Sequence, residues 1–131
     1  MKTKIFGVLL LLIVGGTISA QSTFDKWQAI KEFHTVISQT FHPAEQGNLE
    51  PIKSRSEELS IKAAALLTSD IPAEYRTKEI LATIEKLKAK SSILQKIVAA
   101  KAPDAEITGA LTEVHEIFHE IVGLCSEEKK P

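Results

Sequence analysis

Four histidines and one cysteine are the side chains of this sequence best suited to bind a metal ion: His34, His42, His115, His119 and Cys125. His115 and His119 are four residues apart, so both imidazoles lie on one side of a helix, one turn apart. Two imidazoles at that spacing can share one ion, and His34 on a neighbouring helix could add a third ligand. Zinc and copper(II) both accept imidazole. His34, His115 and His119 are therefore the predicted metal site.

The other candidate ligands fit less well. Glu58 or Glu116 could supply an oxygen ligand or orient an imidazole. A di-iron carboxylate centre needs two Glu-x-x-His motifs and two more glutamates, and only Glu116 to His119 fits that pattern. His42 lies beside Pro43 at the expected end of a helix, where the helix dipole favours a cation by about 0.3–1 kcal/mol. We therefore predict that His42 stabilises a helix end, with Glu45 or Glu50 as its alternative partners.

Four amphipathic segments must position these side chains. In each segment apolar residues recur at alternating spacings of three and four, which places them along one face of a helix. The expected stripes are Trp27, Ile30, His34, Ile37 and Phe41; Ile52, Ser56, Leu59, Ala63 and Leu66; Ile80, Ile84, Leu87, Ser91, Leu94 and Val98; and Ile107, Leu111, Val114, Phe118, Ile121 and Cys125. No segment has the alternation of a strand. The predicted fold class is all-α.

Proline and capping residues predict where the helices begin and end. Pro43 should end the first helix at or before His42, because the residue before a proline avoids the helical region. Side-chain caps are expected from Asn48 for the second helix and from Asp104 for the fourth. The third helix should begin at a short turn near Pro72 or at Thr77. Short connections force neighbouring helices to run in opposite directions, so we expect an antiparallel up-down-up-down four-helix bundle.

Pairing residues across the loops estimates which side chains lie at the same level of this bundle. His34 and His119 fall in roughly one layer. Ser56, Ser91 and His115 fall in the next layer, within about one helical turn. The polar interruptions of the four stripes thus converge on the middle of the bundle. The same convergence has a second interpretation, in which these polar residues set the register of the helices and bind nothing.

The first twenty residues have the pattern of a signal peptide. Lys2 and Lys4 form a basic segment, and residues 5–14 are an apolar stretch too short for a bilayer span of about 20 residues. Small residues then lead to Ala20, after which we place the cleavage. The prediction is a signal peptide at 1–20 and one helical domain at 21–131, located in the periplasm or secreted, with no stable membrane anchor after cleavage.

Charge and motifs exclude several classes of protein. Removal of Lys2 and Lys4 leaves 14 basic against 17 acidic residues, a net charge of −3. That balance lacks the basic stripe of a nucleic-acid-binding protein. The sequence has no P-loop, no dinucleotide-binding glycine motif and no nucleophile elbow. We therefore expect a protein that is not an enzyme and has no nucleic-acid partner.

Cys125 is the only cysteine, so an exported chain cannot form an internal disulfide. It lies six residues beyond His119, about 9 Å along the helix axis, which is too far to share an ion with that imidazole. We expect Cys125 to be a small buried hydrophobic residue packed against Trp27 and Phe24. Pairing with a second chain, to give a homodimer, is the alternative.

In length, export and helical topology the chain resembles four-helix cytochromes of the b562 and c-prime type. That resemblance would imply haem, but the Cys-x-x-Cys-His attachment motif is absent, and the only methionine, Met1, leaves with the signal. A bis-histidine site pairing His34 with His119 or His115 would remain. The three histidines also give a loose similarity to periplasmic helical metal-binding proteins. The functional alternatives are thus a zinc or copper protein, a haem protein, and a structural or interaction protein without a ligand.

Overall fold

The computed structural model describes residues 21–127, which form an all-α structure without strands. The expected signal peptide, 1–20, and the last four residues, 128–131, lie outside the described residues. Residues 21–26 are helical and are separated from the next helix by Trp27. The remaining elements are α2 (Gln28–Glu45), α3 (Glu50–Thr68), the short 3₁₀ turn η1 (Ala73–Tyr75), α4 (Lys78–Ala99) and α5 (Asp104–Glu127). The all-α prediction is confirmed.

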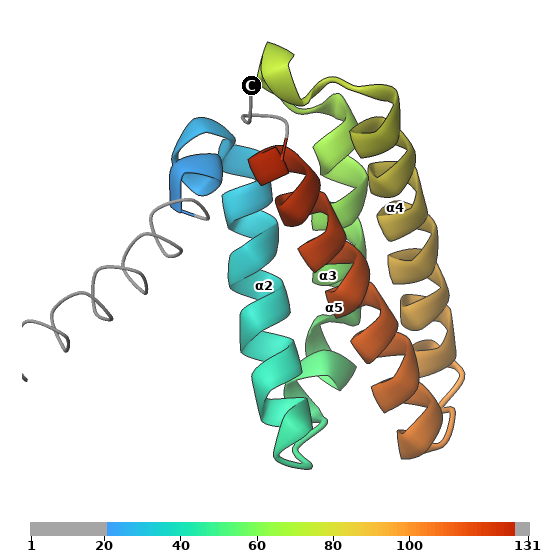
Figure 1. The fold of residues 1–131 in the computed structure, drawn as a ribbon. Helices are drawn as coiled ribbons and strands as arrows, with labels where there is room; N and C mark the ends of the chain where they lie inside the picture. Colours follow the sequence, from blue (N-terminus) through green and yellow to red (C-terminus); the bar gives the residue numbers. More distant parts are fainter. Residues whose placement is uncertain (1–20, 128–131) are drawn as a thin grey trace, which may run out of the picture.

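The four long helices lie side by side around one apolar core (Figure 1). Each helix packs against the next along the chain, and α5 also contacts α2. The backbones of α2 and α5 approach each other less closely than those of the other neighbouring pairs. No helix within residues 21–127 has both the length and the apolar character needed to cross a bilayer.

The stripes predicted for α3, α4 and α5 form most of this core. All stripe residues of α3 and α5 are buried, and in α4 only Val98 at the end of the stripe is partly exposed. The two polar stripe residues, Ser56 and Ser91, are buried as predicted. The Ser91 hydroxyl has no hydrogen-bond partner within residues 21–127.

The stripe predicted for α2 is confirmed at Trp27, Ile30 and Ile37, which are buried, but it differs from the structure at its other two positions. Phe33 and Thr40 are buried, whereas His34 and Phe41 are only half-buried. Both faces repeat at helical spacing, so periodicity alone could not choose between them. Burial of Phe33 removes a large ring from water, and the Thr40 hydroxyl is satisfied by the Val36 carbonyl at 2.9 Å. His34 is therefore at the edge of the core, facing α5, rather than at its centre.

The expected end of α2 before Pro43 is wrong, since the helix continues to Glu45. The chain then turns at Gly47, whose φ of +88° is a conformation that glycine adopts without steric cost. The Asn48 N–H donates to the Pro43 carbonyl at 2.9 Å, and the Gly47 N–H donates to the Ala44 carbonyl at 3.0 Å. This Schellman motif satisfies the last carbonyls and so supports a final turn that contains proline.

The predicted helix starts are confirmed for α4 only, since the N-cap of α3 is Leu49 rather than Asn48. The Thr77 hydroxyl accepts from the Ile80 N–H at 3.1 Å and caps α4, and the 3₁₀ turn after Pro72 is also present. The Asn48 side chain accepts from the N–H of Glu50, the first residue of α3, at 3.2 Å. Asp104 differs from the prediction, because it is the first residue of α5 rather than its cap.

Trp27 and Cys125 both belong to the core. Trp27 is fully buried and its indole N–H donates to the Ser69 hydroxyl at 3.0 Å. Cys125 is also fully buried, as predicted, and Phe24 is partly buried against the same core. Pairing of this thiol with a second chain would require the end of α5 to open, because the side chain is fully buried.

Candidate functional site

All four histidines lie where α2 meets α5, in one continuous row of aromatic and imidazole rings. The row begins on the residues before α2 and ends at the last turn of α2. In order of ring contact, its members are Phe24, His34, Phe118, His119, His115, Phe41 and His42. We call this set the α2–α5 ring row. Large rings fill the wide space between these two helices and keep their polar edges near the surface.

His34 is held by stacking. Its ring centroid is 4.6 Å from that of Phe24 and 5.6 Å from that of Phe118, with 21° between the planes in each pair. Phe118 also contacts the His119 ring, at 5.7 Å. Within residues 21–127 no direct ring contact joins His34 to His115 or His119. The structure thus brings His34 to the correct level but places it next to Phe118 rather than beside the other two imidazoles.

His115 and His119 form a close pair on α5. Their Nε2 atoms are 3.2 Å apart and their rings are nearly perpendicular, at 80°. The His115 ring stacks on Phe41 of α2, with centroids 3.8 Å apart and planes 6° from parallel. This stack fixes the His115 ring, whereas the His119 ring is exposed to solvent. The i, i+4 spacing seen in the sequence therefore produces two nitrogen atoms that face each other.

His42 lies near the His115–His119 pair. Its ring centroid is 6.4 Å from that of His115, and Phe41 contacts both rings. The His42 Nδ1 atom is 3.2 Å from the Glu45 carboxylate, so Glu45 rather than Glu50 is its partner. His42 also lies in the last turn of α2, where a cation is favoured, as predicted. Its nearness to His115 was missed, because it depends on how far α2 extends beyond Pro43.

Burial and neighbouring charge keep two of the histidines neutral. Loss of hydration, followed by the positive charges that His119 and His42 can carry, lowers the pKa of His115 to about 4, although Glu45 opposes this. The pKa of His34 is also lowered, chiefly by burial and then by His119 and His42. A neutral imidazole keeps the lone pair that a metal ion needs. His34 and His115 therefore have that lone pair available at neutral pH.

The carboxylates are arranged differently from the histidines. Glu58 bonds to Arg55 at 2.7 Å, and this ion pair lowers the pKa of its carboxyl group. Glu116 is exposed on α5. Within residues 21–127 no three His, Cys, Asp or Glu side chains stand close enough to hold a metal ion together as they are placed. The predicted trio is therefore a pair, His115 and His119, with His34 apart from it.

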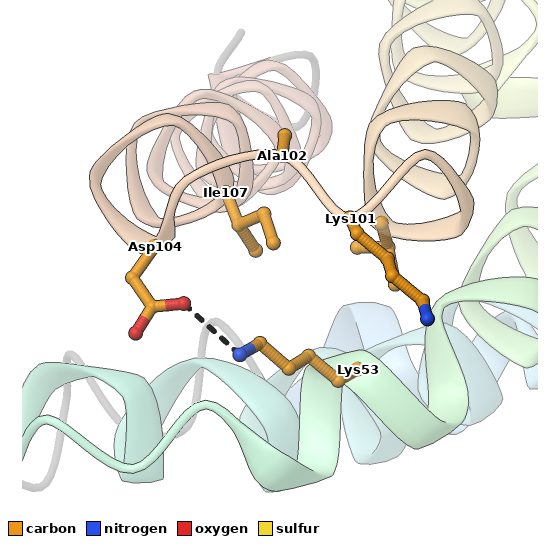
Figure 2. A pocket seen from close by; sticks show the side chains of 6 residues that line it. Lys53, Lys101, Ala102, Asp104 and Ile107 are labelled. Carbon is orange, nitrogen blue, oxygen red and sulfur yellow. Dashed lines mark hydrogen bonds and ion pairs between the residues drawn. The ribbon is translucent and has the colours of Figure 1, made fainter.

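One cavity of about 480 Å³ lies away from the histidines, between α3 and the connection from α4 to α5 (Figure 2). Val98, Ala102 and Ile107 give it an apolar wall. Two charged side chains cross its mouth, since Lys53 Nζ bonds to Asp104 Oδ1 at 2.9 Å. Lys53 and Asp104 satisfy each other's charge, and Lys101 is a third charged side chain that lines the cavity.

Comparison with known proteins adds no functional assignment. No family model, curated protein or solved structure matches this chain. What the protein does must therefore be argued from the α2–α5 ring row.

Proposed function

We propose that this chain is an exported, non-enzymatic helical bundle that binds one zinc or copper(II) ion, with His115 and His119 as the two principal ligands. The proposal includes the finer fold assignment, an antiparallel up-down-up-down arrangement of α2, α3, α4 and α5. Short connections between sequential neighbours support that arrangement. Export follows from the signal-like residues 1–20.

The Nε2 separation in the His115–His119 pair is the observation that carries the proposal. Two nitrogen ligands at 2.0–2.1 Å from a tetrahedral zinc ion stand about 3.3 Å apart. The two Nε2 atoms are 3.2 Å apart before any ion is bound. The pair therefore needs little rearrangement to bind an ion, beyond placing the ring protons on Nδ1.

The His115 side chain is held rigid, which favours metal binding. Phe41 holds His115 by close stacking, so binding loses little side-chain entropy there. The low pKa of His115 also means that protons compete with a metal ion at this ligand only near pH 4.

The alternative without a ligand has its own support in the ring row. One imidazole of the His115–His119 pair can donate a hydrogen bond to the other, and stacking accounts for His34 and His115. In that case the histidines are packing residues. For the haem alternative, Phe118 contacts both His34 and His119, so a porphyrin between those two ligands would have to displace its ring.

Calorimetric titration distinguishes these functions. The full chain is expressed, the accumulated product is purified and stripped with a chelator, and Zn²⁺, Cu²⁺ and Ni²⁺ are added separately. We expect one ion per chain. His115→Phe and His119→Phe should each weaken Zn²⁺ binding by at least about 100-fold, because each removes one of the two chelating nitrogen atoms.

Glu113→Gln is a matched control on the same helix, since it breaks only the Glu113–Lys90 surface ion pair and should bind as the wild type does. A wild-type protein that binds none of the three ions would refute the proposal and favour the ligand-free alternative. A Soret band near 400 nm in the purified protein would instead favour haem.

A further inference from the structure

We infer that His42, and not His34, is the third ligand of the metal site, and that Glu45 orients it. The inference rests on the proposed function of His115 and His119 and extends it to a three-imidazole site that joins α2 to α5. Compared with the ligands predicted from the sequence, only one residue differs, because His42 takes the place of His34.

The last turn of α2 brings His42 to the His115 side of the pair. The centroids of the His42 and His115 rings are 6.4 Å apart, with 72° between the ring planes. Phe41 contacts the His42 ring at 5.9 Å and stacks under His115. Phe41 thus forms a common wall beside both imidazoles.

The Glu45 carboxylate fixes the tautomer that a ligand requires. A carboxylate can only accept a hydrogen bond, so in the 3.2 Å contact the His42 Nδ1 atom carries the proton. The neutral His42 ring then has its lone pair on Nε2, where it can bind an ion. A carboxylate on the distal ring nitrogen is the usual support for a metal-binding histidine, and loss of that support costs about 10–100-fold in affinity.

The site is completed by a movement of the His42 side chain toward both members of the pair, because within the described residues its ring contacts His115 but not His119. Two imidazoles bound to one tetrahedral ion have centroids about 5 Å apart, given nitrogen–metal distances of 2.0–2.1 Å. His42 must therefore approach His115 by roughly 1–1.5 Å. Its side chain is 64% exposed, so rotation about its own bonds meets little packing resistance.

His34 lacks these advantages. Its ring is stacked on both Phe24 and Phe118, and Phe118 contacts the side of His119 as well. To bind the same ion, His34 would have to break both stacks. No carboxylate contact supports its ring within the described residues.

The resulting site suits one class of ion. Three neutral imidazoles favour zinc or copper(II) over magnesium or calcium, which prefer oxygen ligands. The exposure of His42 and His119 leaves the fourth position to water. A site with three protein ligands and one exchangeable position would release its ion more readily than a closed structural site.

Two aromatic substitutions test the inference, because phenylalanine keeps the ring and removes the nitrogen ligand. Zn²⁺ affinity is measured by competition with a chromophoric chelator, and the nitrogen ligands of bound Cu²⁺ are counted from its electron paramagnetic resonance spectrum. We expect His42→Phe to weaken Zn²⁺ binding by at least about 10-fold and to reduce the bound nitrogens from three to two. His34→Phe should keep three nitrogens and change the affinity less than about 3-fold.

The orienting role of Glu45 has a separate test. Glu45→Gln should weaken Zn²⁺ binding by about 10-fold and retain three nitrogens. The control Glu50→Gln should have no effect, because Glu50 is exposed near the same loop but does not bond to His42. Loss of the third nitrogen in His34→Phe, with three nitrogens in His42→Phe, would overturn the inference and leave the proposed function standing. Absence of binding by the wild type would refute the proposed function itself.

Discussion

Acidification should destabilise this protein before its carboxylates titrate, and His115 should be a principal cause. Its pKa is about 4 in the folded protein, against 6.5 for an unperturbed imidazole. Between these values the unfolded chain binds more protons than the folded chain, so stability falls as the pH falls from about 6.5 toward 4. Burial of the ring is the main reason that it stays neutral, and the positive charges that His119 and His42 can carry act in the same direction.

The size of the effect follows from the same two values. A pKa difference of one unit is worth about 1.4 kcal/mol. The largest loss of unfolding free energy that His115 can cause between pH 7.5 and pH 5 is therefore about 2 kcal/mol. The ring is only half-buried, and solvent screening reduces the expected loss to about 1 kcal/mol. A loss of this size is measurable against a total stability of about 5–15 kcal/mol.

The assay is urea unfolding followed by helical circular dichroism, at several values from pH 7.5 to pH 5 and with a chelator present. About 1 kcal/mol corresponds to a shift of roughly 0.5 M in the urea midpoint. Measurements stop at pH 5 because Glu32 and Glu58, whose pKa values are lowered by Lys62 and Arg55 respectively, add their own destabilisation only at lower pH.

His115→Gln should lose less stability over this range than the wild type. The pH dependence of stability that remains in His115→Gln should be smaller still when His34→Gln is added, because the pKa of His34 is lowered in the same direction. If the wild type and the double variant lose equal stability between pH 7.5 and pH 5, neither imidazole is kept neutral by the fold, and the reasoning is wrong.

Three substitutions outside the histidines test the rest of the structure, each by its free energy of unfolding in urea. Lys101→Gly should stabilise the protein by about 0.5–1 kcal/mol, because Lys101 occupies the left-handed position (φ 58°) of the turn between α4 and α5, which glycine adopts without strain; no change would mean that the turn relaxes. Ser91→Ala should be neutral or stabilising by up to about 1 kcal/mol, since it removes a buried hydroxyl without a hydrogen-bond partner, and a loss above 1 kcal/mol would reveal a hidden partner. Thr77→Ala should cost about 0.5–2 kcal/mol through loss of the α4 cap, whereas Thr77→Ser should retain most of the stability.

The spacing of apolar residues was sufficient to predict the buried face where one face of a helix is clearly the most apolar. In α3 and α5 every predicted stripe residue is buried. It was insufficient in α2, where the face with His34 and Phe41 and the face with Phe33 and Thr40 both repeat at helical spacing. Packing against α3 and α5 decides between these faces, and a single sequence does not contain that information.

The candidate site also has a part that the sequence predicts and a part that only the folded structure determines. The His115–His119 pair follows from an i, i+4 spacing, which is a local property of one helix. The position of His42 depends on the final turn of α2, and that turn forms because the bonds of Gly47 and Asn48 support it beyond Pro43. The separation of His34 from the pair depends on Phe24 and Phe118, which come from opposite ends of the described chain.

The location of the histidines gives the proposed ion a structural consequence. The pairs α2–α3, α3–α4 and α4–α5 are each joined by a connection of the chain, whereas α2 and α5 are joined only by side chains and are the less closely packed pair. An ion bound by His115 and His119 alone would bridge two turns of α5 and leave this pair as it is. An ion that also binds His42 would fasten the last turn of α2 to α5, and would link the first and last long helices of the described chain. Binding at 100 times the dissociation constant would then stabilise the fold by about 2.7 kcal/mol, and the added protection from hydrogen exchange should extend into α2. The proposed three-imidazole site would therefore act where the covalent chain does not connect the helices.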